Sequence, residues 1–238
     1  MDDLPGLTPI PCPTSARPLL GMTILVVEDS LYACDAMRLM CLHSGARIRR
    51  ADCLRSARRH LQVYRPTAVI VDLGLPDGSG LDLIAELAVA EPRVTSILGA
   101  SGTEGAEAAA LAAGADGFLA KPLINLGVFQ QTILATLPND RQPAGPRLLR
   151  NEDVRPDPMA YRDDMVHVSN LLDEHSEGPV LDYVAQFLGG VARSADDGQL
   201  AQAADALGAQ RRGGKALNSR LAEIAGMVQE RLGNRAAM

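Results

Sequence analysis

Five short apolar runs alternate with five helix-like stretches between residues 23 and 136, and this alternation limits the fold more than any other feature of the chain. The apolar runs cover residues 23–27, 46–50, 68–71, 95–98 and 117–120. The helix-like stretches cover residues 31–43, 54–64, 81–90, 103–113 and 126–136. Parallel strands need a crossover helix between them, so alternation at this short spacing predicts a parallel sheet with helices on both faces. We expect an α/β domain with a doubly wound (βα)₅ architecture.

The composition of the runs indicates where each strand lies in that sheet. Residues 24–27 and 68–71 are continuously apolar, as central strands buried on both faces should be. In contrast, Arg47, Arg49 and Arg50 crowd the second run. Charge of this kind is tolerated at a sheet edge, where it also blocks unwanted pairing. We therefore expect the second strand at an edge.

The rest of the chain divides into a tail, a linker and a second domain. With 238 residues, one larger and one smaller domain are expected. Five prolines in residues 1–21 predict an extended tail ahead of the (βα)₅ domain at 22–137, and five more mark 138–158 as a linker. Residues 159–238 should form a small all-α bundle for output or dimerisation. Its expected helices cover residues 161–175, 180–194, 199–211 and 215–232.

Charge and cysteine usage exclude several classes of protein. The chain has 23 basic and 29 acidic residues, and this slightly acidic balance argues against a nucleic-acid partner. Its four cysteines have no Cys-x-x-Cys spacing, so we read them as reduced thiols. Asp2 and Asp3 stand where a secretory signal would be basic, and no apolar run of about 18 residues occurs. We expect a cytoplasmic protein with no membrane segment.

Acidic and hydroxyl side chains follow three of the apolar runs. Glu28 and Asp29 end the first run, Asp72 ends the third and Ser101 follows the fourth. In open parallel sheets, active groups collect at the carboxyl ends of central strands. Three carboxylates gathered there would repel one another unless a cation lay among them, and an all-oxygen ligand set suits Mg²⁺. Alone, an acidic pair after a strand is often only a helix cap.

Lys121 adds a positive charge after the fifth run. It is one of only two lysines in a chain whose other basic residues are arginines, and an ammonium group there can contact a phosphoryl oxygen. Phosphoryl transfer mainly requires a positioned nucleophile, a metal ion and charge neutralisation. The carboxylates, Ser101 and Lys121 together supply such a set.

Three motifs in this half resemble the signature of bacterial response-regulator receiver domains. They are Val-Val-Glu-Asp at 26–29, Asp-Leu-Gly-Leu-Pro-Asp-Gly-Ser-Gly at 72–80 and Gly-Ala-Asp-Gly-Phe-Leu-Ala-Lys-Pro at 114–122. Their order and spacing coincide with those of the family over about residues 22–137. The resemblance implies the flavodoxin-like strand order 2-1-3-4-5. It also implies a two-component system with a sensor histidine kinase or a histidine-phosphotransfer protein as phosphodonor.

The resemblance further implies a role for each residue of the set. Asp72 would be the phosphoacceptor, Glu28 and Asp29 would hold Mg²⁺ with it, and Lys121 would pair with the phosphoryl oxygens. Such a domain would catalyse its own phosphorylation and dephosphorylation. We expect no separate enzyme activity from the helical half.

Two residues would form the switch that responds to phosphorylation. Ser101 would be the switch hydroxyl, and Phe118, three positions before Lys121, would be the aromatic rotamer switch. The stretch from Ser101 to Lys121 is a couple of residues shorter than is usual in the family, so Thr103 is an alternative to Ser101.

The helical half leaves several functions open. Residues 200–209 and the long helix after them resemble a histidine-phosphotransfer domain in which Asp205 occupies the histidine position and the following Lys-Gly is absent. This implies lost phosphotransfer and a docking or dimerisation bundle. We rank a regulator that binds a downstream protein or forms a homodimer first. A phosphorelay intermediate comes second, and a DNA-binding transcriptional regulator third.

Overall fold

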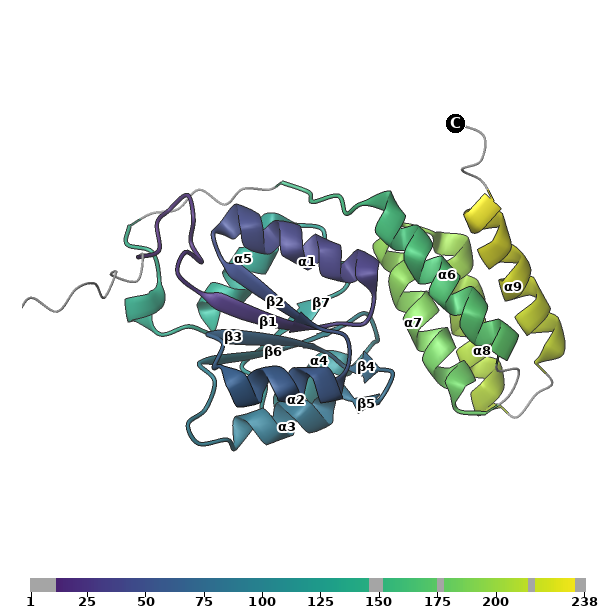
Figure 1. Cartoon of the computed structure of the whole chain (residues 1–238), viewed down its shortest axis with the longest axis horizontal. Coiled ribbons are helices and arrows are strands. Elements are labelled where there is room, and N and C mark those ends of the chain that lie inside the picture. Colours follow the sequence, from purple (N-terminus) through teal and green to yellow (C-terminus); the bar gives the residue numbers. More distant parts are fainter. Residues whose placement is uncertain (1–11, 146–151, 175–177, 214–216, 234–238) are drawn as a thin grey trace, which may run out of the picture.

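The sheet domain precedes the helical bundle in the chain, and the two lie side by side. The computed structural model describes residues 12–145, 152–174, 178–213 and 217–233. Figure 1 shows the bundle against the end of the sheet at which the strands finish. Within these ranges no helix is both long and apolar enough to cross a membrane.

The sheet has the parallel, flavodoxin-like order that the sequence predicts. Its strands are β1 (Thr23–Val27), β2 (Arg47–Ala51), β3 (Ala68–Asp72), β6 (Ser96–Ser101) and β7 (Gly117–Ala120), arranged β2-β1-β3-β6-β7. Every residue of β3 is buried, as a central strand requires. Strand β2 lies at an edge, where Arg47, Arg49 and Arg50 are exposed. The fold class is therefore confirmed.

Helices cover both faces of the sheet. They are α1 (Leu31–Ser44), α2 (Leu54–Val63), α3 (Gly80–Ala88), α4 (Ala106–Ala112) and α5 (Leu126–Ala135). Met37 of α1 and Phe129 of α5 belong to one core, and Leu54 of α2 and Ile84 of α3 belong to the other. Figure 1 shows α1 and α5 on one side of the sheet and α2 and α3 on the opposite side.

The first helix has a defined start and end. Ser30 caps α1 by accepting a hydrogen bond from the Ala33 amide at 3.0 Å. Gly45 ends it in the left-handed region at φ 84°, where a side chain would be strained. This cap fixes the chain directly after Glu28 and Asp29, and so helps to position both carboxylates.

Three local features differ from the sequence-based expectation. Strands β4 (Gly74–Leu75) and β5 (Gly78–Ser79) form a small hairpin after β3, too short to give a periodic pattern. Helix α4 begins only at residue 106, after Gly105 takes a positive φ. The expected tail at 1–21 is not extended where it is described: Leu19 is fully buried in the core beside α1, and its amide bonds to Ser44. Residues 1–11 lie outside the described part.

The expected linker at 138–158 contacts the sheet domain. Its described part includes a 3₁₀ turn, η1 (Asn139–Arg141). Val154 is buried in the core, and its amide bonds to the carbonyl of Ile124 at 2.7 Å. An apolar side chain among the prolines therefore holds this end of the segment against the sheet domain. Residues 146–151 lie outside the described ranges.

The helical half forms a bundle with its own core. Its helices are α6 (Pro158–Glu174), α7 (Val180–Ser194), α8 (Gly198–Arg212) and α9 (Asn218–Gly233). Met165, Leu188, Leu207 and Ile224, one from each helix, are fully buried. The four expected stretches correspond to these helices. The expected ends at residues 175 and 215 lie outside the described ranges.

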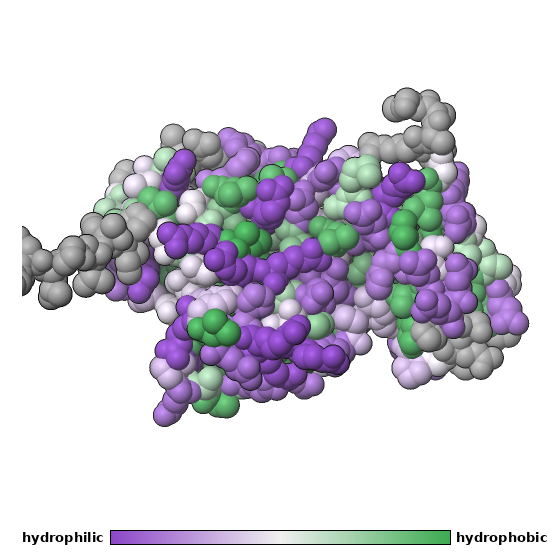
Figure 2. All heavy atoms as spheres, viewed as in Figure 1, coloured by the Kyte–Doolittle hydropathy of each residue, from purple (hydrophilic) through white to green (hydrophobic). Residues whose placement is uncertain are grey.

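The surface is mainly hydrophilic on the face shown in Figure 2. Apolar residues occur there in small groups separated by polar side chains, over both the sheet domain and the bundle. Scattered exposed apolar residues of this kind are normal for a folded domain. This face therefore offers no broad apolar surface for a second copy of the chain within the part that the structure describes.

Candidate functional site

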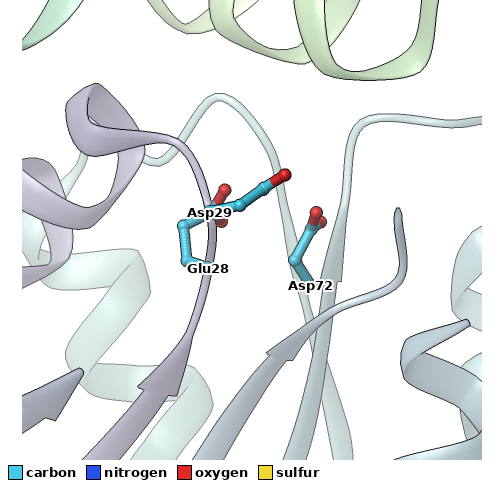
Figure 3. Close-up of side chains that lie close together, drawn as sticks. All are labelled: Glu28, Asp29 and Asp72. Carbon is cyan, nitrogen blue, oxygen red and sulfur yellow. The ribbon is translucent and has the colours of Figure 1, made fainter. Parts of the chain in front are cut away.

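Three carboxylates meet at the carboxyl ends of β1 and β3. Glu28 and Asp29 follow β1 and Asp72 ends β3, and one ligand oxygen from each lies within 4.8 Å of the others. Figure 3 shows the side chains turned toward a common point, with the ribbon of the bundle above them. Glu28 is 1% exposed and Asp72 is 8% exposed. The sequence-based grouping of these residues agrees with the observed geometry.

Lys121 joins two members of this cluster. Its ammonium nitrogen lies 2.6 Å from Oε2 of Glu28 and 2.9 Å from Oδ1 of Asp72. Burial would lower the pKa of Lys121, but Asp72 and Glu28 together raise it above its ordinary value. Lys121 therefore remains protonated, and it fixes one oxygen of the Asp72 carboxylate.

The cluster has more negative groups than Lys121 can neutralise. Burial raises the pKa of Glu28 even though Lys121 opposes the rise. Burial also raises the pKa of Asp29 to about 6, while a hydrogen bond from Tyr183 and the Lys121 charge lower it and nearby Asp72 raises it. A divalent cation would relieve this repulsion, and the ligand set contains only oxygen. The residues present therefore fit a hard cation such as Mg²⁺.

The two hydroxyl candidates lie near the cluster, whereas Phe118 packs against a core of the sheet domain. Ser101 is buried at the end of β6, and its Oγ accepts a hydrogen bond from the Thr103 amide at 3.2 Å. Both residues line the same pocket as Asp72 and Lys121, although Thr103 is exposed. Phe118 lies on β7, partly buried against the core that contains Ile84. The geometry leaves both Ser101 and Thr103 as candidates for the switch hydroxyl.

The helical bundle also contributes to this site. Tyr183 of α7 donates its hydroxyl hydrogen to Oδ2 of Asp29 at 2.6 Å. The pocket around Asp72 is lined in addition by Gln186 and Arg193 of the same helix. Because more than 100 residues separate α7 from these strands in sequence, no local pattern in the sequence indicates this contact.

A second contact holds α6 against the start of α1. Asp164 is a buried carboxylate on α6 that accepts hydrogen bonds from Ser30 Oγ at 2.8 Å, the Leu31 amide at 2.8 Å and the Tyr32 amide at 3.1 Å. The first amides of a helix have no partner within the helix and attract negative charge. Asp164 thus acts as an additional cap supplied by the bundle. No sequence pattern marks Asp164, because an acid in a helix has no signature of such a role.

Asp205, which aligned with the histidine of phosphotransfer domains, has a structural partner. It lies on α8, and its carboxylate oxygens accept hydrogen bonds from Nη1 of Arg193 at 3.0 and 3.2 Å. The likeness of the bundle to a phosphotransfer domain stays a prediction.

Comparison with known proteins identifies the first half of the chain. Residues 24–133 match the family model described as the response regulator receiver domain. These residues form a receiver domain. The matched segment of the receiver contains the carboxylate cluster, Ser101 and Lys121.

Curated relatives match over the receiver region. The KDP operon transcriptional regulatory protein KdpE of Escherichia coli K12 is 32% identical over 114 residues, which cover 48% of this chain and 50% of KdpE. The virulence transcriptional regulatory protein PhoP of Salmonella typhimurium is 33% identical over 103 residues, covering 42% and 46%. The chain thus spans about half the length of these relatives.

Solved structures match over a similar share of the chain. A putative response regulator from Chloroflexus aurantiacus is 31% identical, with a TM-score of 0.40, and covers 42% of this chain and 85% of its own. A signal receiver domain of a DNA-binding response regulator from Colwellia psychrerythraea is 23% identical, with a TM-score of 0.43, and covers 48% and 95%.

Proposed function

We propose that the chain is a response regulator that accepts a phosphoryl group on Asp72 from a histidine kinase or a histidine-phosphotransfer protein. The supporting observation is the position of Asp72 at the end of β3 of a receiver domain, with Glu28, Asp29 and Lys121 gathered around it. The phosphodonor and a cytoplasmic location stay predictions.

In this proposal each side chain has a defined chemical task. Glu28, Asp29 and Asp72 would hold Mg²⁺, which would neutralise charge on the transferring group. A carboxylate oxygen of Asp72 attacks phosphorus, the bond from phosphorus to the histidine nitrogen breaks, and the electron pair stays on that nitrogen. Lys121 keeps the Asp72 carboxylate oriented and balances negative charge on the phosphoryl oxygens.

The switch follows from the added charge. An aspartyl phosphate carries about −1.5 to −2 charges, by analogy with other phosphorylated side chains. Ser101, or Thr103 in its place, would move toward this group, and Phe118 would turn inward. The β6 and β7 side of the receiver would then change shape.

The helical bundle has several candidate output functions. We favour a bundle that binds a downstream protein or pairs two copies of the chain. A phosphorelay intermediate is the second candidate. The names of KdpE and PhoP describe transcriptional regulators, which supports the DNA-binding alternative, although the similarity reaches only the receiver half of this chain.

Uptake of phosphate tests the proposed acceptor. Full-length protein is incubated with a small phosphodonor and Mg²⁺, and its mass is measured before and after. We expect wild type to gain one phosphoryl group and Asp72→Asn to gain none. Asp82→Asn, which removes an exposed carboxylate on α3, should behave as wild type. Phosphorylation of Asp72→Asn would refute the assignment.

The output is tested with the same full-length protein. Sedimentation before and after phosphorylation shows whether two chains pair, and salt-dependent retardation of duplex DNA would favour the third alternative. Acid-labile phosphate that appears on the bundle half when phosphorylated partners are supplied would favour the relay.

A further inference from the structure

Helix α7 forms part of the wall of the phosphoacceptor pocket. Besides the bond from Tyr183 to Asp29, the Gln186 amide rests on the backbone of Gly74, where an added methyl group would collide with it. Arg193 lies about two turns after Gln186 on α7, and its Nε is 3.4 Å from the position that a Cβ on Gly102 would occupy. Gly102 directly follows the buried Ser101.

One hydrogen-bond donor of Arg193 is unsatisfied within the described residues. Its Nη1 is bound by Asp205, which orients the guanidinium group. Its Nε is buried, yet it has no hydrogen-bond partner among the residues that the structure describes. A buried donor without a partner is costly, and guanidinium groups bind phosphate oxygens well because their donors are fixed in a plane. The same pocket contains Asp72, Ser101 and Lys121.

The charges of the pocket also indicate a role for Arg193. With the aspartyl phosphate on Asp72, the carboxylates of Glu28 and Asp29 would bring the negative charge to about four. A divalent cation and Lys121 would supply about three positive charges. Arg193, although it is paired with Asp205, would bring a further positive group to the pocket from the other domain.

We propose that Arg193 binds the phosphoryl group on Asp72, so that the phosphoryl site is completed by the helical domain. This inference rests on the proposed function of Asp72. Its consequence is that phosphorylation strengthens the contact between the receiver and the bundle. Arg193 would then connect the phosphoryl group to α8 through Asp205.

Binding of beryllofluoride with Mg²⁺, which mimics a phosphoryl group on an aspartate, tests the proposal. Affinity is measured by calorimetry on full-length wild type, Asp72→Asn, Arg193→Ala and Arg193→Gln. We expect Asp72→Asn to lose binding. Both Arg193 variants should bind about tenfold more weakly or worse, the effect of losing one charge-assisted hydrogen bond. Arg193→Gln keeps a polar side chain of similar reach, in case Arg193→Ala loosens the bundle.

A matched control is available in the same pair of helices. Arg211 of α8 pairs with Asp182 of α7, as Arg193 of α7 pairs with Asp205 of α8, but neither Arg211 nor Asp182 lines the pocket. Arg211→Ala should therefore bind the analogue like wild type. Amide exchange gives a second readout: the analogue should slow exchange in α7 of wild type, and should not do so in Arg193→Gln.

The possible outcomes separate the two proposals. Undiminished binding to Asp72→Asn would refute the phosphoacceptor assignment itself. Binding that depends on Asp72 but is equal in wild type and both Arg193 variants would show that Arg193 only pairs with Asp205. Equal weakening by Arg211→Ala would likewise overturn the inference, because the effect would then come from bundle stability.

Discussion

Replacing Asp164 with alanine should release the bundle from the receiver. The carboxylate is 2% exposed and accepts three hydrogen bonds, from Ser30, Leu31 and Tyr32. Hydrogen bonds to charged groups contribute about 1.5–3 kcal/mol each but are not additive on one carboxylate. Burial raises the pKa of Asp164 despite these bonds, so desolvation offsets part of the gain. We expect a net loss of about 2–4 kcal/mol of docking free energy, or roughly 30-fold to several-hundred-fold in the docking equilibrium.

Hydrogen exchange of single amides measures this loss. In wild type, the Leu31 and Tyr32 amides are bound to Asp164, whereas the Ala33 amide is bound to Ser30 Oγ within the receiver. In Asp164→Ala, exchange at Leu31 and Tyr32 should become faster by about the factor given above. Exchange at Ala33 should change much less, because its partner remains.

The neighbouring residue provides the control. Asp163 is also on α6 but is exposed and makes none of these three hydrogen bonds, so Asp163→Ala removes a carboxylate from the next position of the helix and leaves the three bonds in place. It should leave all three amides unchanged. If Asp164→Ala also leaves exchange at Leu31 and Tyr32 within twofold of wild type, Asp164 does not hold the domains together.

Three further results are expected. Because burial raises the pKa of Asp29 to about 6, a cation must displace its proton in acid. The Mg²⁺ affinity measured by calorimetry should therefore fall as the pH drops from about 7 to about 5. An affinity that does not change with pH would contradict this. Gly80→Ala drives a methyl group into the Asp72 carbonyl oxygen and should lower the free energy of unfolding of the receiver, measured in denaturant, by about 1–3 kcal/mol. Gly226→Ala, in open space on α9, should not destabilise the protein. Arg231 lowers the pKa of Asp197 by hydrogen bonding, so the pair stabilises the fold above the ordinary aspartate pKa, and this stabilisation is lost as the pH falls through the lowered value. Asp197→Asn should lower the free energy of unfolding by about 1–2 kcal/mol near neutral pH. Its difference from wild type in thermal unfolding should shrink below about pH 4.

The receiver could be predicted because its determinants are local. Apolar runs such as residues 68–71 define the strands, and the topology of a parallel sheet then brings Glu28, Asp72 and Lys121 to one edge without any knowledge of tertiary contacts. The two-residue strands β4 and β5 were missed, since a period cannot be seen in two residues. The burial of Leu19 was not predicted, because the prolines around it indicate an extended tail.

The docking of the bundle could not be predicted in the same way. Asp164, Tyr183 and Arg193 lie on helices whose patterns indicate only the core of the bundle. Which of their polar side chains face another domain depends on how the core of the bundle is placed relative to the cores of the receiver. One chain provides no local signal for that placement.

The contact between α7 and the pocket around Asp72 has a consequence for the rate of the proposed signalling. In the proposed function, a phosphodonor must reach Asp72 at the carboxyl end of β3, where Tyr183, Gln186 and Arg193 already lie. The donor therefore competes with a tethered domain, whose effective concentration is of millimolar order or higher. Its apparent affinity falls in proportion to the fraction of molecules in which the bundle has moved away. With the bundle over Asp72, water would also approach an attached phosphoryl group more slowly. The bundle would therefore set both the amount of phosphodonor needed for phosphorylation and the lifetime of the phosphoryl group.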